Sequence, residues 1–242
     1  MNLLLLSNST QYGCGYLEHA LDTVTTFLPD GARLAFVPYA LADHDGYTAR
    51  VRGALEPSGI SVRGVHENPD PLSELAASDA VFIGGGNSFR LLDALYRTGL
   101  HEAVRDAARN GLPYMGASAG TNMAAPSLRT SNDMPIVQPP SFETLGLVPF
   151  QINPHYLDPD PASTHKGETR EQRLTEFLEE NDVPVLGLRE GSWLRVREGG
   201  ASVEGAHPAR LFTRGAPPRE LAAGSDVSWL LATEPEFDAP RR

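Results

Sequence analysis

Cysteine is almost absent from this sequence: Cys14 stands alone among 242 residues, so no internal disulfide can form. A single thiol suits a reducing compartment. Long apolar runs are absent as well. The apolar start, residues 3–6, is far too short for the core of a secretion signal and follows no basic segment. No stretch reaches the roughly 18 apolar residues that a membrane-spanning helix needs. We therefore expect a cytoplasmic protein with no membrane partner.

Positive charge is scarce, with 20 Lys and Arg against 31 Asp and Glu and a net charge of −11. Nucleic-acid binding requires clustered basic side chains that contact phosphates, so we expect no nucleic-acid partner. The sequence also lacks a His-x-x-x-His pair and a set of cysteines, which are patterns typical of metal sites. We predict no metal and no cofactor.

The first half of the chain alternates apolar runs with amphipathic segments. The runs predict buried strands at residues 3–6, 34–37, 60–65, 80–83 and 114–115. The segments between them predict helices at residues 16–27, 47–55, 89–96 and 101–108. This alternation is typical of an α/β fold with a mostly parallel sheet covered on both faces. In such sheets functional residues gather beyond the carboxyl ends of strands. Three loops do so here, at residues 7–12, 84–88 and around Ser118.

The second half is less regular. Eight prolines interrupt residues 126–168, a segment that is still apolar enough to pack in an ordered form. Residues 168–180 predict a helix and residues 185–188 a buried strand. Short β-like runs predict a carboxyl-terminal antiparallel hairpin, and they lie at residues 193–196, 201–203 and 210–213. Because no linker, repeat or low-complexity tract interrupts the chain, we expect residues 1–242 to form one domain.

Residues 113–120 contain the pattern G-x-S-x-G, with Ser118 at the end of a short apolar strand and at the start of a helical segment. In a sharp strand-to-helix turn of this kind, the serine hydroxyl is exposed while backbone N–H groups gather beneath it. Side chains in place of Gly116 and Gly120 would clash across the turn. We predict that Ser118 is a nucleophile, with a plain glycine-rich turn as the alternative.

A serine hydroxyl needs a base to become a good nucleophile. Of the seven histidines, His155 follows an apolar segment and a proline that fixes its loop, so we predict that it is the base. His165 is the nearest rival, but it stands in a polar segment. His19 and His101 lie on predicted helices and are expected to be solvated.

The imidazole in turn needs a carboxylate that selects its tautomer and stabilises the imidazolium. Glu190 directly follows the strand predicted at residues 185–188, at a strand end where parallel sheets place active residues. Asp133 lies shortly after Ser118 in an Asn-Asp-Met-Pro segment, where it would serve equally well in a turn. Geometry favours Glu190 slightly, and both acids stay open.

A run of three glycines, residues 84–86, follows the strand at 80–83 and precedes a predicted helix. The exposed backbone N–H of Gly86 suits an oxyanion hole together with that of Ala119. A phosphate cradle is the rival interpretation, but the run lacks both G-x-G-x-x-G and G-K-S/T. A glycine-rich turn that binds no ligand is the third interpretation.

Five blocks of sequence occur together and in order. They read F-I-G-G-G-N-S-F-R-L at 82–91, G-A-S-A-G-T-N-M-A-A-P at 116–126, S-N-D-M-P-I at 131–136, I-N-P-H-Y at 152–156 and H-K-G-E-T-R-E-Q-R at 165–173. This set strongly resembles the peptidase E family of α-aspartyl dipeptidases, which are serine hydrolases. The resemblance implies an α/β three-layer sandwich with a mostly parallel central sheet, similar to class I glutamine amidotransferases. It implies a cytosolic enzyme that releases an amino-terminal aspartate from dipeptides and other short peptides.

The resemblance also implies roles for residues. Ser118 matches the nucleophile and His155 the base. Asp133, in the Asn-Asp-Met-Pro segment, matches the position of the family's acid, while Glu190 also falls where a family glutamate has been considered for that role. Amidotransferases of this fold use a cysteine at the turn, so Ser118 with a remote Cys14 argues against glutaminase chemistry. The last fifty residues or so carry no motif that maps onto the family.

An aspartyl substrate is repelled by a chain of charge −11, so local cations must attract it. We predict that Arg170, at a helix start beyond the His155 loop, binds the aspartyl carboxylate, with Arg90 and Arg129 as alternatives. Asn87 is predicted as a second substrate-binding residue. The expected partner is a small peptide with an amino-terminal aspartate, and a homo-oligomer is left open. Two other functions remain: a cyanophycinase-like peptidase acting on β-aspartyl bonds, and a non-catalytic ligand-binding protein on the same fold.

Overall fold

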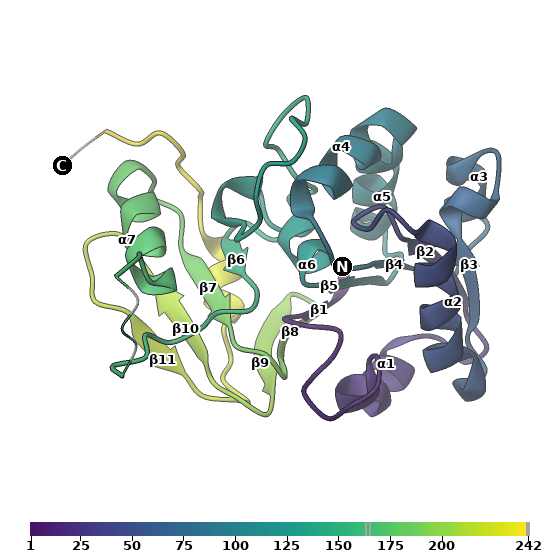
Figure 1. Ribbon diagram of the computed structural model, residues 1–242, viewed down its shortest axis with the longest axis horizontal. Coiled ribbons are helices and arrows are strands. Elements are labelled where there is room, and N and C mark those ends of the chain that lie inside the picture. Colours follow the sequence, from purple (N-terminus) through teal and green to yellow (C-terminus); the bar gives the residue numbers. More distant parts are fainter. Residues whose placement is uncertain (163, 165, 241–242) are drawn as a thin grey trace.

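The computed structural model describes residues 1–162, 164 and 166–240, and its centre is a seven-stranded sheet (Figure 1). The strand order is β3-β2-β4-β5-β1-β8-β9. The bounds are Asn2–Leu6 for β1, Arg33–Val37 for β2, Ser61–Gly64 for β3, Ala80–Ile83 for β4, Tyr114–Ala117 for β5, Ser192–Arg197 for β8 and Gly200–Gly205 for β9. The first five strands in this order run parallel, whereas β8 and β9 are each antiparallel to their neighbours. The mostly parallel sheet is therefore confirmed.

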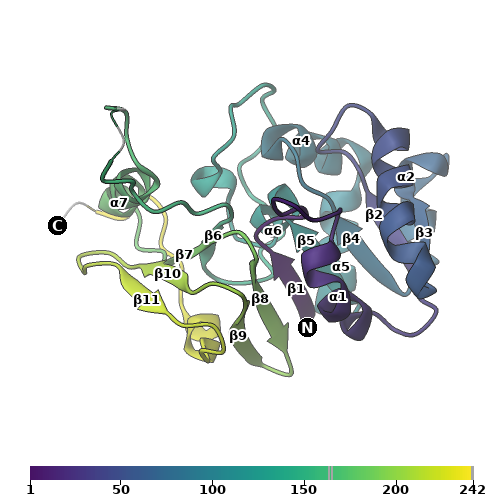
Figure 2. The ribbon, with the colours of Figure 1, turned by 60° about the horizontal axis from the view of Figure 1, so that its bottom comes forward.

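Helices cover both faces of this sheet because its strands are apolar on both sides. In β1, Leu3 and Leu5 join one core cluster and Leu4 and Leu6 join another. Helices α1 (Leu21–Phe27) and α2 (His44–Leu55) pack on the second cluster, and α1 lies on the near side of the sheet in Figure 2. The helices that pack on the first cluster are α3 (Pro71–Ala76), α4 (Ser88–Thr98), α5 (Leu100–Arg109) and α6 (Ala119–Met123).

A second sheet, which the sequence pattern did not separate from the first, lies beside β8 and β9 (Figure 1). Its order is β11-β10-β7-β6, with β6 at Gln151–Asn153, β7 at Val185–Leu188, β10 at Ala209–Phe212 and β11 at Arg219–Leu221. Strands β6 and β7 are parallel, and the other pairs are antiparallel. Helix α7 (Arg170–Glu180) packs Leu174 and Leu178 on the outer face. The inner face joins the larger core cluster, so we infer that both sheets belong to one domain.

Several elements differ from the sequence-based expectation. The helix predicted at residues 16–27 is a 3-10 turn, Glu18–Ala20, followed by α1. The antiparallel hairpin is confirmed as β8 and β9, but it extends the central sheet, whereas the run at 210–213 lies in the second sheet. The sequence pattern missed α3 and β6, which are short. The remaining 3-10 helices are Glu56–Ser58, Val65–Glu67, Leu128–Thr130 and Ser228–Ala232.

The parallel pairing of β6 with β7 decides where the site forms. Asn153 pairs with Gly187, so the two strands end at the same edge, and the loops that follow carry His155 and Glu190. The carboxyl ends of β1, β4 and β5 carry Ser7, the glycine run and Ser118.

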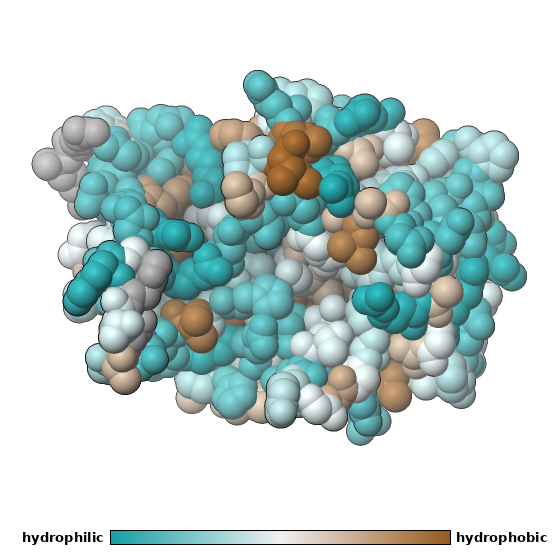
Figure 3. Space-filling model, viewed as in Figure 1, coloured by the Kyte–Doolittle hydropathy of each residue, from teal (hydrophilic) through white to brown (hydrophobic). Residues whose placement is uncertain are grey.

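The surface seen in Figure 3 is mostly hydrophilic, with apolar side chains in small separate groups. Among the described residues, no helix is long and apolar enough to cross a bilayer.

Candidate active site

Ser118 occupies a strained turn between β5 and α6. Its φ of 53° and ψ of −109° lie in a region that residues with a side chain seldom adopt. The turn is fixed to β1, because the N–H of Ser118 donates to the carbonyl of Leu6 at 3.1 Å. The hydroxyl of Thr121 donates to the same carbonyl at 2.6 Å. Two hydrogen bonds to one carbonyl group thus hold the strained turn against the end of β1.

The two glycines of the motif are required by close backbone contacts. A Cβ on Gly116 would lie 2.6 Å from the carbonyl carbon of Gly120. A Cβ on Gly120 would overlap the carbonyl oxygen of Ile83 in β4. The clash across the turn that the sequence predicted is therefore confirmed.

His155 and Glu190 form a hydrogen-bonded chain with Ser118. The Nε2 atom of His155 is 2.8 Å from the Ser118 hydroxyl, and its Nδ1 atom is 2.7 Å from a Glu190 carboxylate oxygen. The arrangement fits a tautomer in which Nδ1–H donates to Glu190 and Nε2 accepts from Ser118. The side chains of His155 and Glu190 are 39% and 54% exposed, so water weakens the electrostatic interaction between them.

Ser7 holds the backbone of the His155 loop, and sequence reasoning assigned it no role. Its hydroxyl accepts from the N–H of His155 at 2.9 Å and donates to the carbonyl of Leu188 at 2.9 Å. His155 itself has a φ of 52°, so a left-handed backbone aims its ring at Ser118. The fully buried Ser7 therefore links the end of β1 to the ends of β6 and β7.

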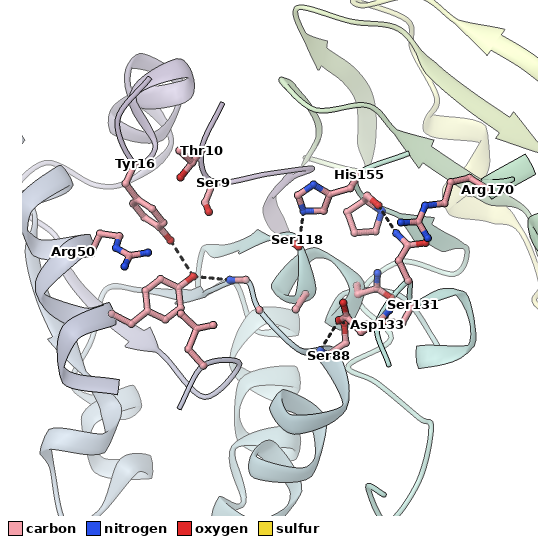
Figure 4. Close-up of a pocket in the computed structure, with 18 residues that line it drawn as sticks. Ser9, Thr10, Tyr16, Arg50, Ser88, Ser118, Ser131, Asp133, His155 and Arg170 are labelled. Carbon is pink, nitrogen blue, oxygen red and sulfur yellow. Dashed lines mark hydrogen bonds between the residues drawn. The ribbon is translucent and has the colours of Figure 1, made fainter. Parts of the chain in front are cut away.

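Asp133 makes no hydrogen bond to the imidazole. One of its oxygens, Oδ2, accepts from both the N–H and the hydroxyl of Ser88, at the amino-terminal end of α4. Negative charge is favourable at this end of a helix. Asp133 also lines the cavity in front of Ser118, as Figure 4 shows.

Asn87 caps the same helix end. Its side chain accepts from the N–H of Arg90 at 3.0 Å and donates to the carbonyl of Met134 at 2.9 Å. Both of its polar ends are thus used within the protein. Its predicted contact with substrate stays a prediction.

The glycine run at residues 84–86 lies against Ser118. A Cβ on Gly85 would lie 3.0 Å from the Cβ of Ser118, and the N–H of Gly85 donates to the Tyr47 hydroxyl at 2.8 Å. The N–H groups of Gly86 and Ala119 have no acceptor among the described residues, and both residues line the cavity. They are the donors available to an oxyanion.

Tyr47 and Tyr16 support the glycine run, and the sequence carried no signal for either. Their hydroxyls are 3.2 Å apart. Burial raises the pKa of Tyr47, so its hydroxyl stays protonated at neutral pH.

The cavity has a volume of about 500 Å³, within the usual range for small-molecule sites. Arg170, the first residue of α7, lines it and forms no ion pair among the described residues. Burial lowers the pKa of Arg170, with Arg173 acting in the same direction and Asp133 against it.

Of the alternative cations, Arg129 is paired with Asp238, and Arg90 does not line the cavity. Arg50 lines it from the opposite side (Figure 4).

Three other histidines carry expectations from the sequence. His101 was expected to be solvated, which is wrong: it is 3% exposed, stacks on Tyr96 and bonds the Thr144 carbonyl at 3.1 Å. His19 is half-buried, and both of its ring nitrogens are buried with no hydrogen bond among the described residues, so the expectation that it is solvated fails for its polar atoms. His165 lies outside the described residues.

No group of metal-binding side chains occurs within the described ranges.

The sequence matches the model of peptidase family S51 over residues 3–204. The chain belongs to this family. Peptidase E of Streptomyces coelicolor is 78% identical over the full length of both chains. The probable α-aspartyl dipeptidase of Drosophila melanogaster is 51% identical over 95% of this chain and 97% of its own. Peptidase E of Escherichia coli O1:K1 is 42% identical over 93% of this chain and 99% of its own.

Two solved structures share the fold of this S51 peptidase. A putative peptidase E from Listeria monocytogenes aligns with a TM-score of 0.65 and 22% identity, over 85% of this chain and 98% of that one. A peptidase from an acI-B1 actinobacterium aligns with a TM-score of 0.69 and 17% identity, over 93% and 96%. The predicted family and the predicted enzyme class, a serine-type peptidase, are therefore confirmed. A non-catalytic binding protein is excluded.

Proposed function

We propose that this peptidase releases an amino-terminal aspartate from dipeptides and other short peptides, with Ser118 as nucleophile and His155 as base. The observation that carries the proposal is the chain of hydrogen bonds from Ser118 through His155 to Glu190. The name of the Drosophila melanogaster relative, a probable α-aspartyl dipeptidase, supports the choice of aspartate.

The first half of the reaction forms an ester. As the Ser118 oxygen attacks the carbonyl carbon after aspartate, His155 Nε2 takes the hydroxyl proton. The carbonyl oxygen becomes an oxyanion that the N–H groups of Gly86 and Ala119 stabilise. When the C–N bond breaks, His155 gives its proton to the leaving amine, and an aspartyl ester remains on Ser118.

The second half hydrolyses that ester. Water gives a proton to His155 and its oxygen attacks the ester carbonyl carbon. The ester bond then breaks, the proton returns to the Ser118 oxygen, and free aspartate leaves. Throughout, the Glu190 carboxylate accepts from Nδ1–H and stabilises the imidazolium. We assign the acid role to Glu190, since Asp133 makes no bond to the ring.

Two of the charged groups that line the cavity, Arg170 and Asp133, divide the recognition of aspartate. Arg170 is a free planar cation that can bind the aspartyl carboxylate through two parallel hydrogen bonds. The second oxygen of Asp133, which makes no hydrogen bond among the described residues, is an acceptor for the substrate ammonium.

A cytoplasmic location and self-association belong to this proposal as well. The exposed, unpaired Cys14 is consistent with a cytoplasmic location.

A substrate panel tests the proposal. We expect kcat/KM for Asp-Leu to exceed that for Asn-Leu about ten- to a hundred-fold, because the amide loses a charge-assisted bond. Glu-Leu and amino-terminally acetylated Asp-Leu should be poor substrates. The β-linked isomer of Asp-Leu tests the cyanophycinase-like alternative and should not be cleaved. Equal rates on Asp-Leu, Asn-Leu and Ala-Leu would refute aspartate recognition.

A further inference from the structure

A second arginine stands on the side of the cavity opposite Arg170. Arg50 projects from α2, and in Figure 4 it lies on one side of Ser118 while Arg170 lies on the other. Like Arg170, Arg50 forms no ion pair or hydrogen bond within residues 1–162, 164 and 166–240. The chain carries 31 acidic side chains against 20 basic ones, so an unpaired arginine at a cavity is a site that favours an anion.

The position of Arg50 follows from the spacing on α2. Tyr47 and Arg50 are three residues apart, so they lie on the same face of the helix. The guanidinium carbon of Arg50 is 6.0 Å from the centre of the Tyr47 ring, close enough for a cation–π contact. Tyr47 is 3% exposed and its hydroxyl accepts from Gly85 N–H, which ties it to the glycine run beside Ser118. The Arg50 guanidinium therefore lies beside the ring of a buried tyrosine, and it is still accessible from the cavity.

A dipeptide that begins with aspartate has two carboxylates, one on each side of the bond to be cut. The aspartyl side chain is on the acyl side, and the terminal carboxylate is on the leaving side, one residue away. Because Arg170 is assigned to the aspartyl carboxylate, the terminal carboxylate must lie on the opposite side of Ser118. Ser9, Thr10 and the Tyr16 hydroxyl line the same side of the cavity as Arg50 (Figure 4) and add neutral hydrogen-bonding groups.

We propose that Arg50 binds the terminal carboxylate of the leaving residue and so selects dipeptides over longer peptides. The inference rests on the proposed function, because it takes the acyl side of the cavity to be the side of Arg170. A tripeptide carries its terminal carboxylate one residue farther from the scissile bond, and a neutral peptide bond takes its place in front of Arg50. The contact with Arg50 is thereby lost, and on the leaving side only the buried surface of the leaving residue still holds the substrate.

The test compares Asp-Leu with Asp-leucinamide, which has the same shape without the terminal charge. In the unaltered enzyme, kcat/KM should be about ten- to a hundred-fold higher for Asp-Leu, the factor that a charge-assisted pair provides. Arg50→Gln should remove this preference by lowering the rate on Asp-Leu, with the rate on the amide changed less than about two-fold. Arg50→Lys keeps the charge and should recover part of the preference.

Arg219→Gln is the matched control. Arg219 also lies over an aromatic ring, 5.3 Å from the centre of Trp229, and does not line this cavity. The substitution removes the same charge from the chain, so it should leave the preference unchanged. An equal loss on both peptides in Arg50→Gln would overturn the proposal, since Arg50 would then act through Tyr47. An unchanged preference would overturn it as well.

A binding experiment separates this proposal from the proposed function. In Ser118→Ala protein, calorimetry should show tighter binding of Asp-Leu than of Asp-leucinamide, and adding Arg50→Gln should abolish the difference. If Ser118→Ala still cleaves Asp-Leu, the role of Ser118 fails, and the ratio of rates on the two peptides still tests Arg50. If Ser118→Ala binds both peptides equally, the role of Arg50 fails while that of Ser118 stands.

Discussion

The part of the site that holds the nucleophile and the part that holds the base are built in different ways. Around Ser118, backbone segments lie so close that only glycine fits at Gly116 and Gly120. Around His155, the side chains are partly exposed, and hydrogen bonds through Ser7 fix the loop. The first geometry is imposed by steric exclusion and the second by a few polar contacts. The nucleophile part should therefore tolerate no added atoms, and the base part should be more sensitive to loss of single hydrogen bonds.

The largest expected effect is that of Ser118→Ala. Removing the hydroxyl should lower kcat on Asp-Leu by about 10⁴-fold or more, because acyl-enzyme formation is lost. The fold should be unaffected, since the hydroxyl is no part of the backbone packing of the turn. Thermal unfolding within a few degrees of the unaltered protein, together with steady-state kinetics, checks both points; turnover within ten-fold would contradict the role of Ser118.

Gly120→Ala tests the steric part of the comparison. A methyl group there overlaps the Ile83 carbonyl, and we expect a loss of about 1–3 kcal/mol in the free energy of unfolding, with activity lost as the turn shifts. The control is Gly53→Ala in α2, where a Cβ meets no atom within 4 Å. Alanine is the better helix former by about 0.5–1 kcal/mol, so this variant should be more stable. Urea unfolding that ranked the two variants the other way would break the comparison.

Ser7→Ala tests the polar part. The N–H of His155 would lose its acceptor and the His155 ring its fixed aim, so kcat should fall about ten- to a hundred-fold. The free energy of unfolding should fall by about 1–3 kcal/mol, the cost of an unpaired buried group. Ser127→Ala is the control, a buried serine that also accepts from a backbone N–H, that of Arg129, but does not line the cavity. It should affect stability alone; an equal loss of kcat in both variants would show that Ser7 has no specific role.

The smallest effect concerns pH and lies outside both parts. Burial lowers the pKa of His101 in the folded chain. The unfolded chain therefore binds more protons, and the free energy of unfolding should decrease as pH falls through about 6.5, the ordinary pKa of histidine. His101→Gln removes this contribution. Unfolding curves at pH 7.5 and 5.5 should show a smaller difference in the variant, and an unchanged difference would contradict a buried neutral His101.

The sequence predicted the nucleophile part better than the base part, for a physical reason. The Ser118 turn is local: a strand, two glycines and a helix follow one another within residues 114–123 and make the pattern visible. The choice between Asp133 and Glu190 depends on which strand pairs with β6, which is only three residues long and gave no periodicity. Ser7, Tyr47 and Arg50 act on the site from other elements. No local pattern identifies residues that meet only through tertiary packing.

The expectation for His101 failed for a related reason. The amphipathic pattern of the helix predicts that its histidine faces solvent. The loop that carries Thr144 covers His101, however, and the Thr144 carbonyl accepts its hydrogen bond. The covering segment is far from the helix in sequence and contains no regular element that could be predicted.

The central claim is that Ser118, His155 and Glu190 act as one unit, and labelling by a serine-directed phosphonate tests it most directly. The label should be found on Ser118 by mass spectrometry of peptides. His155→Ala and Glu190→Gln should both slow labelling strongly, whereas Asp133→Asn, which leaves the imidazole contacts intact, should label within about three-fold of the unaltered rate. Labelling that slows in Asp133→Asn but not in Glu190→Gln, or that falls on another serine, would contradict the account.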